Sequence, residues 1–447
     1  MGRAKHVLLV ALAIALIIAL PLVAVLSVLP SQGTGVQWSS EGGYRGAPAV
    51  DGLGNLYLLV DDGTDGTGNV LLRSLDNRGL LRWELPLAGS FLPPVVGAEG
   101  DVYLVRTVRT VDEGAVYGEK ALSAVMAVSP GGQVRWTYDA SVDFPEHSMV
   151  VPPVVPGDGV VYLALASGTQ QSPALSYVAA LGPGGGLLWR CPVPGKVSSL
   201  LPPSPGRPLL AASSGNLCFI DGAGILLRAV DLGVPSVQAG PVDLNGTIVV
   251  GVDAGPDVPP EVWGLDREGM KRWNVSVAPD GAAPDRAIRS LFARGGTAFV
   301  LTSGGTEVRY SDASDRPAEI TSLPAVLTAV SRDGEVLSAR EVPGEASMTS
   351  WAEGPIVFSR DSIHAFGSAG EPRGSYPVPV GRWLNDLSVG PDGQTYLLQG
   401  GLWTGLVAVE GAPWDGAVEQ RGTQVLWILG ALALSLLLAY LIVRMRR

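Results

Sequence analysis

Charged residues are scarce in this chain, and those with a positive charge are the scarcer. Only 16% of its 447 residues are Asp, Glu, Lys or Arg, and 31 Lys and Arg stand against 42 Asp and Glu, which gives a formal net charge of −11. Phosphate contacts need clustered Lys and Arg. The composition therefore argues against nucleic acid as a partner.

Cysteine and histidine are rarer still, with two of the former and three of the latter. Cys191 and Cys218 have no CxxC element and no neighbouring histidine, and His147 and His364 lie far apart in the sequence. No GxSxG nucleophile motif occurs either. We therefore predict no catalytic, cofactor-binding or metal-binding residue. For Cys191 and Cys218, a disulfide and two separate buried thiols remain open as alternatives.

Glycine, proline and tryptophan, by contrast, are abundant. The chain has 59 Gly, 35 Pro and 11 Trp. Such a composition suits β structure with many turns and does not suit a helical protein.

Two long apolar runs lie near the ends of the chain. The first, Val7–Leu29, carries no charge and follows Arg3, Lys5 and His6. It is long enough to cross a bilayer and longer than the apolar region of a cleaved signal peptide. We therefore predict that residues 1–30 form an uncleaved signal anchor, with a cleaved signal peptide as the alternative.

The second apolar run predicts a transmembrane helix over residues 423–443, followed by a basic tail, residues 444–447. Its core is Val425–Val443. Basic residues flank membrane spans on the cytoplasmic side, so we expect both termini in the cytoplasm and residues 35–416 outside it. The alternative is that both runs are buried core helices.

A strand, turn, strand pattern recurs between these runs. It occurs as "PPVVGAEGDVYLV" around Tyr103, and again around Tyr57, Tyr162 and Tyr396. A Gly-containing turn between apolar residues of period two is typical of a β-hairpin. Each occurrence therefore predicts one hairpin of a repeating unit.

A second pattern follows each hairpin, with Gly four residues before Trp, as in "LDNRGLLRW". Gly permits the positive φ of a tight turn, and the Trp offers a large face to the neighbouring unit. Arg228, Ser338 and Gly374 replace Trp in later repeats, where we expect this docking to be lost. The predicted structural positions are turn residues Gly79, Gly132, Gly185 and Gly269, and docking residues Trp83, Trp136, Trp189 and Trp273.

Units of four strands repeated eight times predict an all-β, eight-bladed β-propeller. The last unit is short of its outermost strand. We expect the segment around Trp38, which follows the first apolar run, to supply that strand and close the ring. A seven-bladed propeller of the WD-repeat or NHL type is the alternative architecture.

The paired patterns "PxVxxxGxxY" and "ALDxxGxxxW" resemble the quinoprotein-type, or PQQ-like, propeller repeat over residues 35–416. The resemblance implies tryptophan docking between blades. The dehydrogenases of that family bind PQQ with calcium near adjacent cysteines, so the resemblance also implies this cofactor. This chain has no adjacent cysteine pair. We therefore predict no cofactor and keep PQQ with calcium as the alternative.

These features together predict a membrane-tethered, extracytoplasmic propeller without enzymatic activity. It would act as a binding or scaffold module for a protein, a peptide or an envelope ligand. The alternatives are a quinoprotein-type cofactor-binding enzyme and a ligand sensor that works through a membrane partner.

Overall fold

The computed structural model describes most of the region between the two apolar runs. The predicted spans, residues 1–30 and 423–443, and the basic tail, residues 444–447, lie outside the described residues. Where the chain is described, its helix is too short to cross a membrane. The described residues are 36–61, 69–111, 119–145, 147–149, 151–167, 175–253, 258–277, 286–304, 306–310, 317–322, 324–351, 353–378, 382–401 and 405–409.

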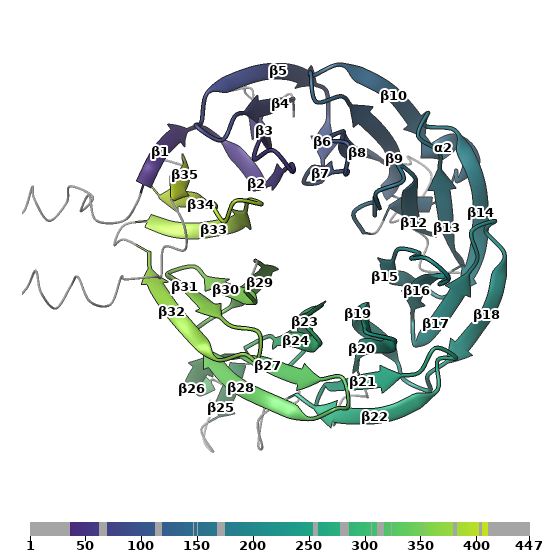
Figure 1. Ribbon diagram of the computed structural model, residues 1–447, viewed down its shortest axis with the longest axis vertical. Helices are drawn as coiled ribbons and strands as arrows, with labels where there is room; N and C mark the ends of the chain where they lie inside the picture. Colours follow the sequence, from purple (N-terminus) through teal and green to yellow (C-terminus); the bar gives the residue numbers. More distant parts are fainter. Residues whose placement is uncertain are drawn as a thin grey trace, which may run out of the picture. The chain divides into compact units, whose positions relative to one another are not determined.

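Eight antiparallel sheets, the blades, are arranged in a ring and confirm the predicted eight-bladed propeller (Figure 1). Each blade runs from an innermost strand at the centre of the ring to an outermost strand at its perimeter. The first four blades are β2 (Tyr44–Val50), β3 (Leu56–Asp61), β4 (Val70–Leu75) and β5 (Leu81–Leu87); β6 (Ser90–Phe91) and β7 (Val95–Val96) with β8 (Val102–Val111), β9 (Glu119–Val128) and β10 (Val134–Asp139); β11 (His147–Met149), β12 (Val161–Ser167), β13 (Leu175–Leu181) and β14 (Leu187–Pro194); and β15 (Val197–Leu201), β16 (Leu209–Ser213), β17 (Asn216–Ile220) and β18 (Leu226–Asp231).

The other four blades repeat this order with two additions. A hairpin of β25 (Thr306–Tyr310) and β26 (Pro317–Ser322) is inserted in blade 6, and the short helix α2 (Ala140–Asp143) joins blades 2 and 3. The four blades are β19 (Ser236–Leu244), β20 (Thr247–Asp253), β21 (Glu261–Leu265) and β22 (Lys271–Ser276); β23 (Ile288–Arg294), β24 (Thr297–Thr302), β27 (Ala325–Ser331) and β28 (Val336–Val342); β29 (Ala346–Ser350), β30 (Pro355–Ser359), β31 (Ser362–Phe366) and β32 (Pro372–Pro377); and β33 (Arg382–Val389), β34 (Thr395–Gly401), β35 (Gly405–Val409) and β1 (Val36–Glu41).

The hydrophobic pattern of each strand follows its position in the blade. Strand β3, "LYLLVD", is buried at every residue but the last, because both of its faces pack against other blades. The outermost strand β5, "LRWELPL", alternates between exposed and partly buried residues from Arg82 to Pro86 and ends with the buried Leu87. The core is therefore a series of apolar layers between blades, and not one central cluster.

In blades 1 to 7, the turn before the outermost strand is built around a glycine with positive φ. In blade 1, Gly79 has φ 79° and donates its N–H to the Asp76 carbonyl oxygen over 2.9 Å. Asp76 Oδ1 accepts from the backbone N–H groups of Arg78 and Leu80, over 3.0 and 2.8 Å. The turn thus satisfies its own backbone groups and leaves one flat face at the glycine.

The tryptophan of one blade packs on the turn glycine of the next. A Cβ atom added to Gly132 would lie 2.7 Å from Trp83 Cδ2, and Trp83 Nε1 donates to the Pro130 carbonyl oxygen over 2.8 Å. Trp136 makes the same contacts with Gly185 and the Pro183 carbonyl oxygen. The remaining two pairs are Trp189 on Gly224 and Trp273 on Gly334.

A tyrosine of the same blade supports most of these tryptophans from the inner side. The ring centroids of Tyr57 and Trp83 are 5.9 Å apart, with the planes tilted by 45°. The aromatic residue of each predicted hairpin and the Trp of the following pattern are therefore one packing unit. The other pairs are Tyr103 with Trp136, Tyr162 with Trp189 and Tyr396 with Trp38.

Two of the residues that replace Trp retain part of the contact, contrary to the expectation that docking is lost there. Arg228 stacks on Phe219, with its guanidinium carbon 4.0 Å from the ring centroid, and donates to the Arg267 carbonyl oxygen of the next turn. Ser338 Oγ donates to the Ala369 carbonyl oxygen over 3.0 Å. The predicted turn residue Gly269 consequently faces Phe219 and Val230 instead of a tryptophan.

The segment around Trp38 closes the ring, as predicted. Strand β1 pairs with β35 and becomes the outermost strand of blade 8. Trp38 packs on Gly79 of blade 1, and its Nε1 donates to the Asn77 carbonyl oxygen over 3.0 Å. The position of Trp38 in the ring is therefore that of the docking tryptophans in the other blades.

The innermost strands of blades 8 and 1 are also joined. Asp386 Oδ2 accepts the Ala47 N–H over 2.8 Å, and Ser388 Oγ donates to the Pro48 carbonyl oxygen over 2.6 Å. Burial raises the pKa of the Asp386 carboxyl group, although its two backbone hydrogen bonds oppose this effect.

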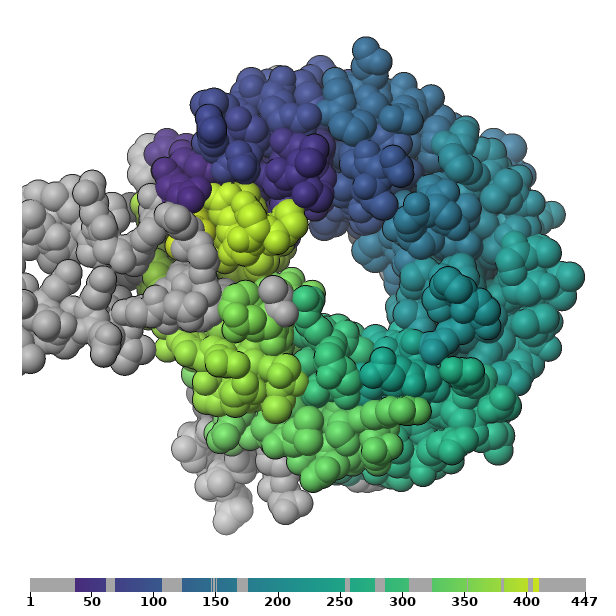
Figure 2. Space-filling view, viewed as in Figure 1, coloured from purple at the N-terminus to yellow at the C-terminus, as the bar shows by residue number. Residues whose placement is uncertain are grey.

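The ring has an open centre, seen from one side in Figure 2. Its two faces differ in their connections. One, which we name the turn face, carries the tight turns between the first and second strands of each blade and, in blades 1 to 7, between the third and fourth strands. The opposite loop face carries the other connections. Gly405, at the start of β35, lies beside Ser40, at the end of β1. The chain therefore enters β1 and leaves β35 at the turn face.

The docking contact predicts a clear loss of stability for Trp136→Ala. The side chain is partly buried, so we expect the free energy of unfolding to fall by about 2–4 kcal/mol, below the value for a fully buried tryptophan. The control is Val134→Ala on the same strand, where the residue is 45% exposed. This substitution should change the free energy of unfolding by at most about 0.5 kcal/mol. Chemical denaturation measures both, and equal effects would contradict the docking role.

Candidate ligand-binding site

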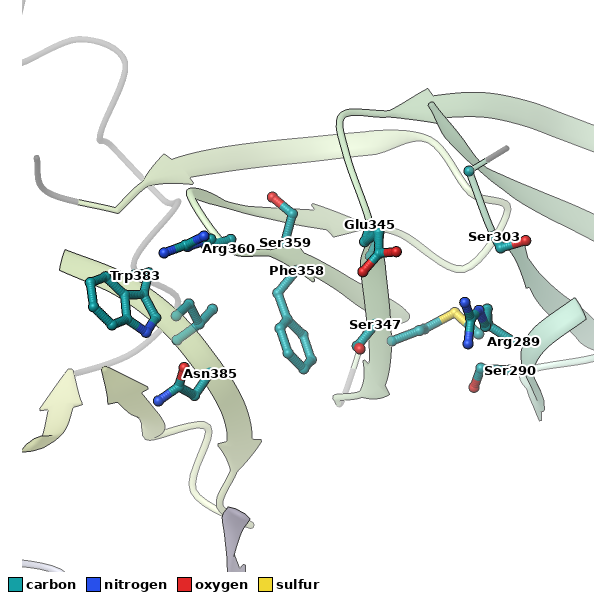
Figure 3. Close-up of a pocket in the computed structure, with 14 residues that line it drawn as sticks. Arg289, Ser290, Ser303, Glu345, Ser347, Phe358, Ser359, Arg360, Trp383 and Asn385 are labelled. Carbon is teal, nitrogen blue, oxygen red and sulfur yellow. The ribbon is translucent and has the colours of Figure 1, made fainter. Parts of the chain in front are cut away.

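A pocket of about 650 Å³ opens on the loop face where blades 6, 7 and 8 meet (Figure 3). Its wall comes from the starts of the innermost strands β23, β29 and β33, the end of β30 and the residues that directly follow β24 and β30. Antiparallel pairing brings these strand ends to one edge, because an innermost strand starts where the second strand of its blade ends. Short segments from three blades therefore form one site.

The chemistry of the pocket is mixed, and its charged side chains are few. Arg289, Arg360 and Glu345 are charged, and all three are exposed. Within the described residues, neither arginine forms an ion pair. The uncharged polar residues of the wall are Ser290, Ser303, Ser347, Ser359 and Asn385.

Arg360 is held at one end of the pocket by two contacts. Its guanidinium carbon lies 4.9 Å from the centroid of the Trp383 ring. Its carbonyl oxygen accepts the Leu384 N–H over 2.8 Å, which links blade 7 to the start of β33. The stacking favours a cation over the ring and leaves the N–H groups of the guanidinium available to a ligand.

Figure 3 shows Arg289 at the opposite end of the pocket, beside Ser290 and Ser303, with Glu345 and Ser347 between the two arginines. Ser303 Oγ accepts the Ala287 N–H over 2.9 Å, which fixes the approach to β23. The two cations are thus carried by different blades, 6 and 7, and a ligand that reaches both must be extended.

One polar cluster beside the pocket resembles a catalytic arrangement without having its geometry. His364 Nε2 lies 3.1 Å from Ser362 Oγ, and burial lowers the pKa of the imidazole, so it is a neutral base at pH 7. The carboxylate of Asp361, however, accepts from Ser359 Oγ over 2.8 Å and makes no hydrogen bond to the imidazole. These residues therefore lack the chain of hydrogen bonds from serine to histidine to carboxylate that activates a serine nucleophile.

The described residues also contain no metal cluster. No group of three or more His, Cys, Asp or Glu side chains is arranged to hold a metal ion in this part of the chain. The prediction of no metal site concerns the whole chain and remains a prediction.

The sequence-predicted positions lie away from this pocket. The docking residues Trp83, Trp136, Trp189 and Trp273 are on outermost strands at the perimeter of the ring. Of these, Trp273 also lines a smaller hollow of about 340 Å³ on the turn face, together with Asp266 and Arg272, which pair with each other over 3.4 Å.

Sequence reasoning missed every residue of the main pocket. Arg289 and Arg360 occur in the unremarkable stretches "AIRS" and "FSRD". The signal that was present is positional, because both arginines lie at strand ends of one face in consecutive blades. That signal becomes visible once the strands of each repeat are assigned.

The two cysteines are free thiols in the structure and belong to one apolar cluster between blades 3 and 4. Cys191 is on β14 and Cys218 on β17. Burial raises the pKa of both thiols, to about 11 for Cys218. Of the two alternatives left open by the sequence, the structure therefore has buried, unpaired thiols.

No family model matches this sequence, and no curated protein sequence is similar to it. Among solved structures, the Dos1 propeller is similar with a TM-score of 0.52 and 11% identity, over 84% of this chain and 95% of that one. Dihydro-heme d1 dehydrogenase NirN, solved in complex with DHE, has a TM-score of 0.48 and 12% identity, over 80% of this chain and 72% of that one. At these identities the similarity to the Dos1 propeller supports the propeller fold alone.

The buried thiols predict a pH-dependent contribution to stability. The pKa of Cys218 is higher in the folded protein, about 11 against an ordinary 9.0, so the folded state binds its proton more tightly. The stability advantage of wild type over Cys218→Ala should be constant below about pH 8 and fall by about 2–3 kcal/mol between pH 9 and 11. Chemical denaturation across this pH range measures it, and a constant difference would refute the shift.

Proposed function

We propose that this protein is a non-enzymatic binding module that holds a protein, a peptide or an envelope ligand in the loop-face pocket, and that it works tethered to a membrane on the extracytoplasmic side. The observation that carries the proposal is the pocket itself. It joins two arginines that form no ion pair with any described residue, a stacked tryptophan and several hydroxyl groups across three blades. Such a mixture suits recognition of a ligand.

The connectivity of the ring supports a tethered module. Strand β1 starts and β35 ends at the turn face, and the pocket opens on the loop face. The two described ends of the ring therefore lie at the face opposite the pocket, which is compatible with a tether at either end.

We further propose that the blades belong to the quinoprotein-type repeat family. The support is the packing unit of Tyr, Trp and turn Gly, as in Tyr57, Trp83 and Gly132, at the positions where the sequence resembles that repeat. We propose no cofactor, because the chain lacks the adjacent cysteine pair that the resemblance implies near PQQ. Among the described residues, no group of three or more His, Cys, Asp or Glu side chains is arranged to hold calcium. Added PQQ and calcium should therefore leave the absorbance of the purified protein unchanged after desalting.

Cross-linking from defined positions tests the binding function. A photoreactive amino acid in place of Ser347, at the pocket, should give an adduct with an envelope protein or ligand when the full-length chain is irradiated in its own membranes. The same residue in place of Glu335, which is exposed on the turn face, is the matched control and should not give that adduct.

Mass spectrometry of the adducts decides between the outcomes. A species found at the Ser347 position and absent from the Glu335 position is the expected result. Identical adducts at both positions, or none at Ser347, would contradict binding in the pocket. Dye-linked alcohol oxidation after addition of PQQ and calcium would contradict the non-enzymatic assignment and favour the quinoprotein alternative.

A further inference from the structure

The chemical class of the ligand is indicated by the charges of the pocket, since the protein as a whole is acidic. The net charge of the chain is −11, yet the pocket wall contains two cations, Arg289 and Arg360, and one anion, Glu345. A guanidinium group presents a planar fork of N–H donors that matches a carboxylate. The attraction of an anionic ligand to the arginines at both ends of the pocket therefore offsets its repulsion by the acidic protein surface.

The backbone at the floor of the pocket indicates a peptide. Strand β29 is the innermost strand of blade 7, so one of its edges has no partner strand in the order β29, β30, β31, β32. Its first residues, Ala346, Ser347 and Met348, line the pocket. A free strand edge presents N–H and C=O groups to which an extended peptide can add as a further strand.

The aromatic residues argue against a sugar as the alternative ligand. A Cβ atom added to Gly400 would lie 2.2 Å from Trp383 Nε1, so the Trp383 ring packs closely on its own sheet. Arg360 covers the ring as well. Phe358 is only 6% exposed. Both aromatic side chains of the pocket are thus packed against protein groups, which leaves less ring surface for a sugar to stack on.

We propose that the pocket binds an extended acidic peptide segment of a partner protein. Two of its carboxylates pair with Arg289 and Arg360, and its backbone runs along the free edge of β29. Glu345 lies between the arginines and disfavours a third carboxylate there (Figure 3). This inference rests on the proposed function, because it assigns a ligand class to the same site.

The test uses random dodecapeptides displayed on phage, selected against the full-length protein in detergent. Wild type should enrich peptides with Asp or Glu at two separated positions. The charge-reversed double variant Arg289→Glu, Arg360→Glu should lose this enrichment. Arg294→Glu, at the exposed other end of the same strand β23, is the matched control and should retain it.

The strongest selected peptide is then labelled and titrated. Arg289→Ala and Arg360→Ala should each weaken its binding about tenfold, as expected for the loss of one charge-assisted contact. Raising the salt from about 0.05 to about 0.5 M should weaken it as well. Because both arginines are exposed, the thermal melts of these variants should match wild type, which separates loss of binding from loss of folding.

Three results would overturn the proposal. The first is a selected consensus without acidic residues, and the second is a consensus that the charge-reversed variant still enriches. The third is binding of an acidic oligosaccharide, such as oligogalacturonate, that depends on both arginines when no peptide binds. If a ligand binds in the pocket at all, the cross-link from position 347 still forms in each case. The cross-link therefore distinguishes an error in the ligand class from an error in the proposed function.

Discussion

The contact between a tryptophan and the turn glycine of the next blade is the interaction on which the rest of this ring depends. Each blade is a sheet with apolar residues on both faces and is not stable alone. Trp83 can lie flat on Gly132 because that glycine has no Cβ, and the positive φ of the turn excludes most other residues. A single residue pair thus fixes the turn and the angle between neighbouring blades.

The fold was predictable because its determinants are local and repeated. The hairpin and Gly–Trp patterns recur with a fixed internal spacing, although the intervals between repeats vary. The short last unit together with Trp38 indicated how the ring closes. Arg228 was misinterpreted for the same reason. It differs from Trp in side-chain type, but its guanidinium reaches the same kind of backbone carbonyl in the next turn. Residue type alone does not reveal a hydrogen bond to backbone.

The candidate site was not predictable because no single repeat contains it. Arg289, Arg360 and Trp383 come from three blades and share only their position at the loop-face ends of strands. None belongs to a motif with a spacing that chemistry requires. Residues that recur in each repeat, on the turn face and between blades, therefore hold the fold, while the pocket on the loop face consists of residues that belong to no repeated pattern.

Closure by β1 also has a consequence for the order in which the protein is made. The first strand of the ring to leave the ribosome pairs with β35, one of the last, and Trp38 has its hydrogen-bond partner in blade 1 while its strand belongs to blade 8. Contacts between such distant parts of a chain form slowly, because a long loop must close first. During synthesis β1 must stay unpaired while seven blades assemble, and its exposed edge is then open to wrong partners. A chain interrupted before blade 8 would be left with an open ring, in which β1 has no β35 to pair with.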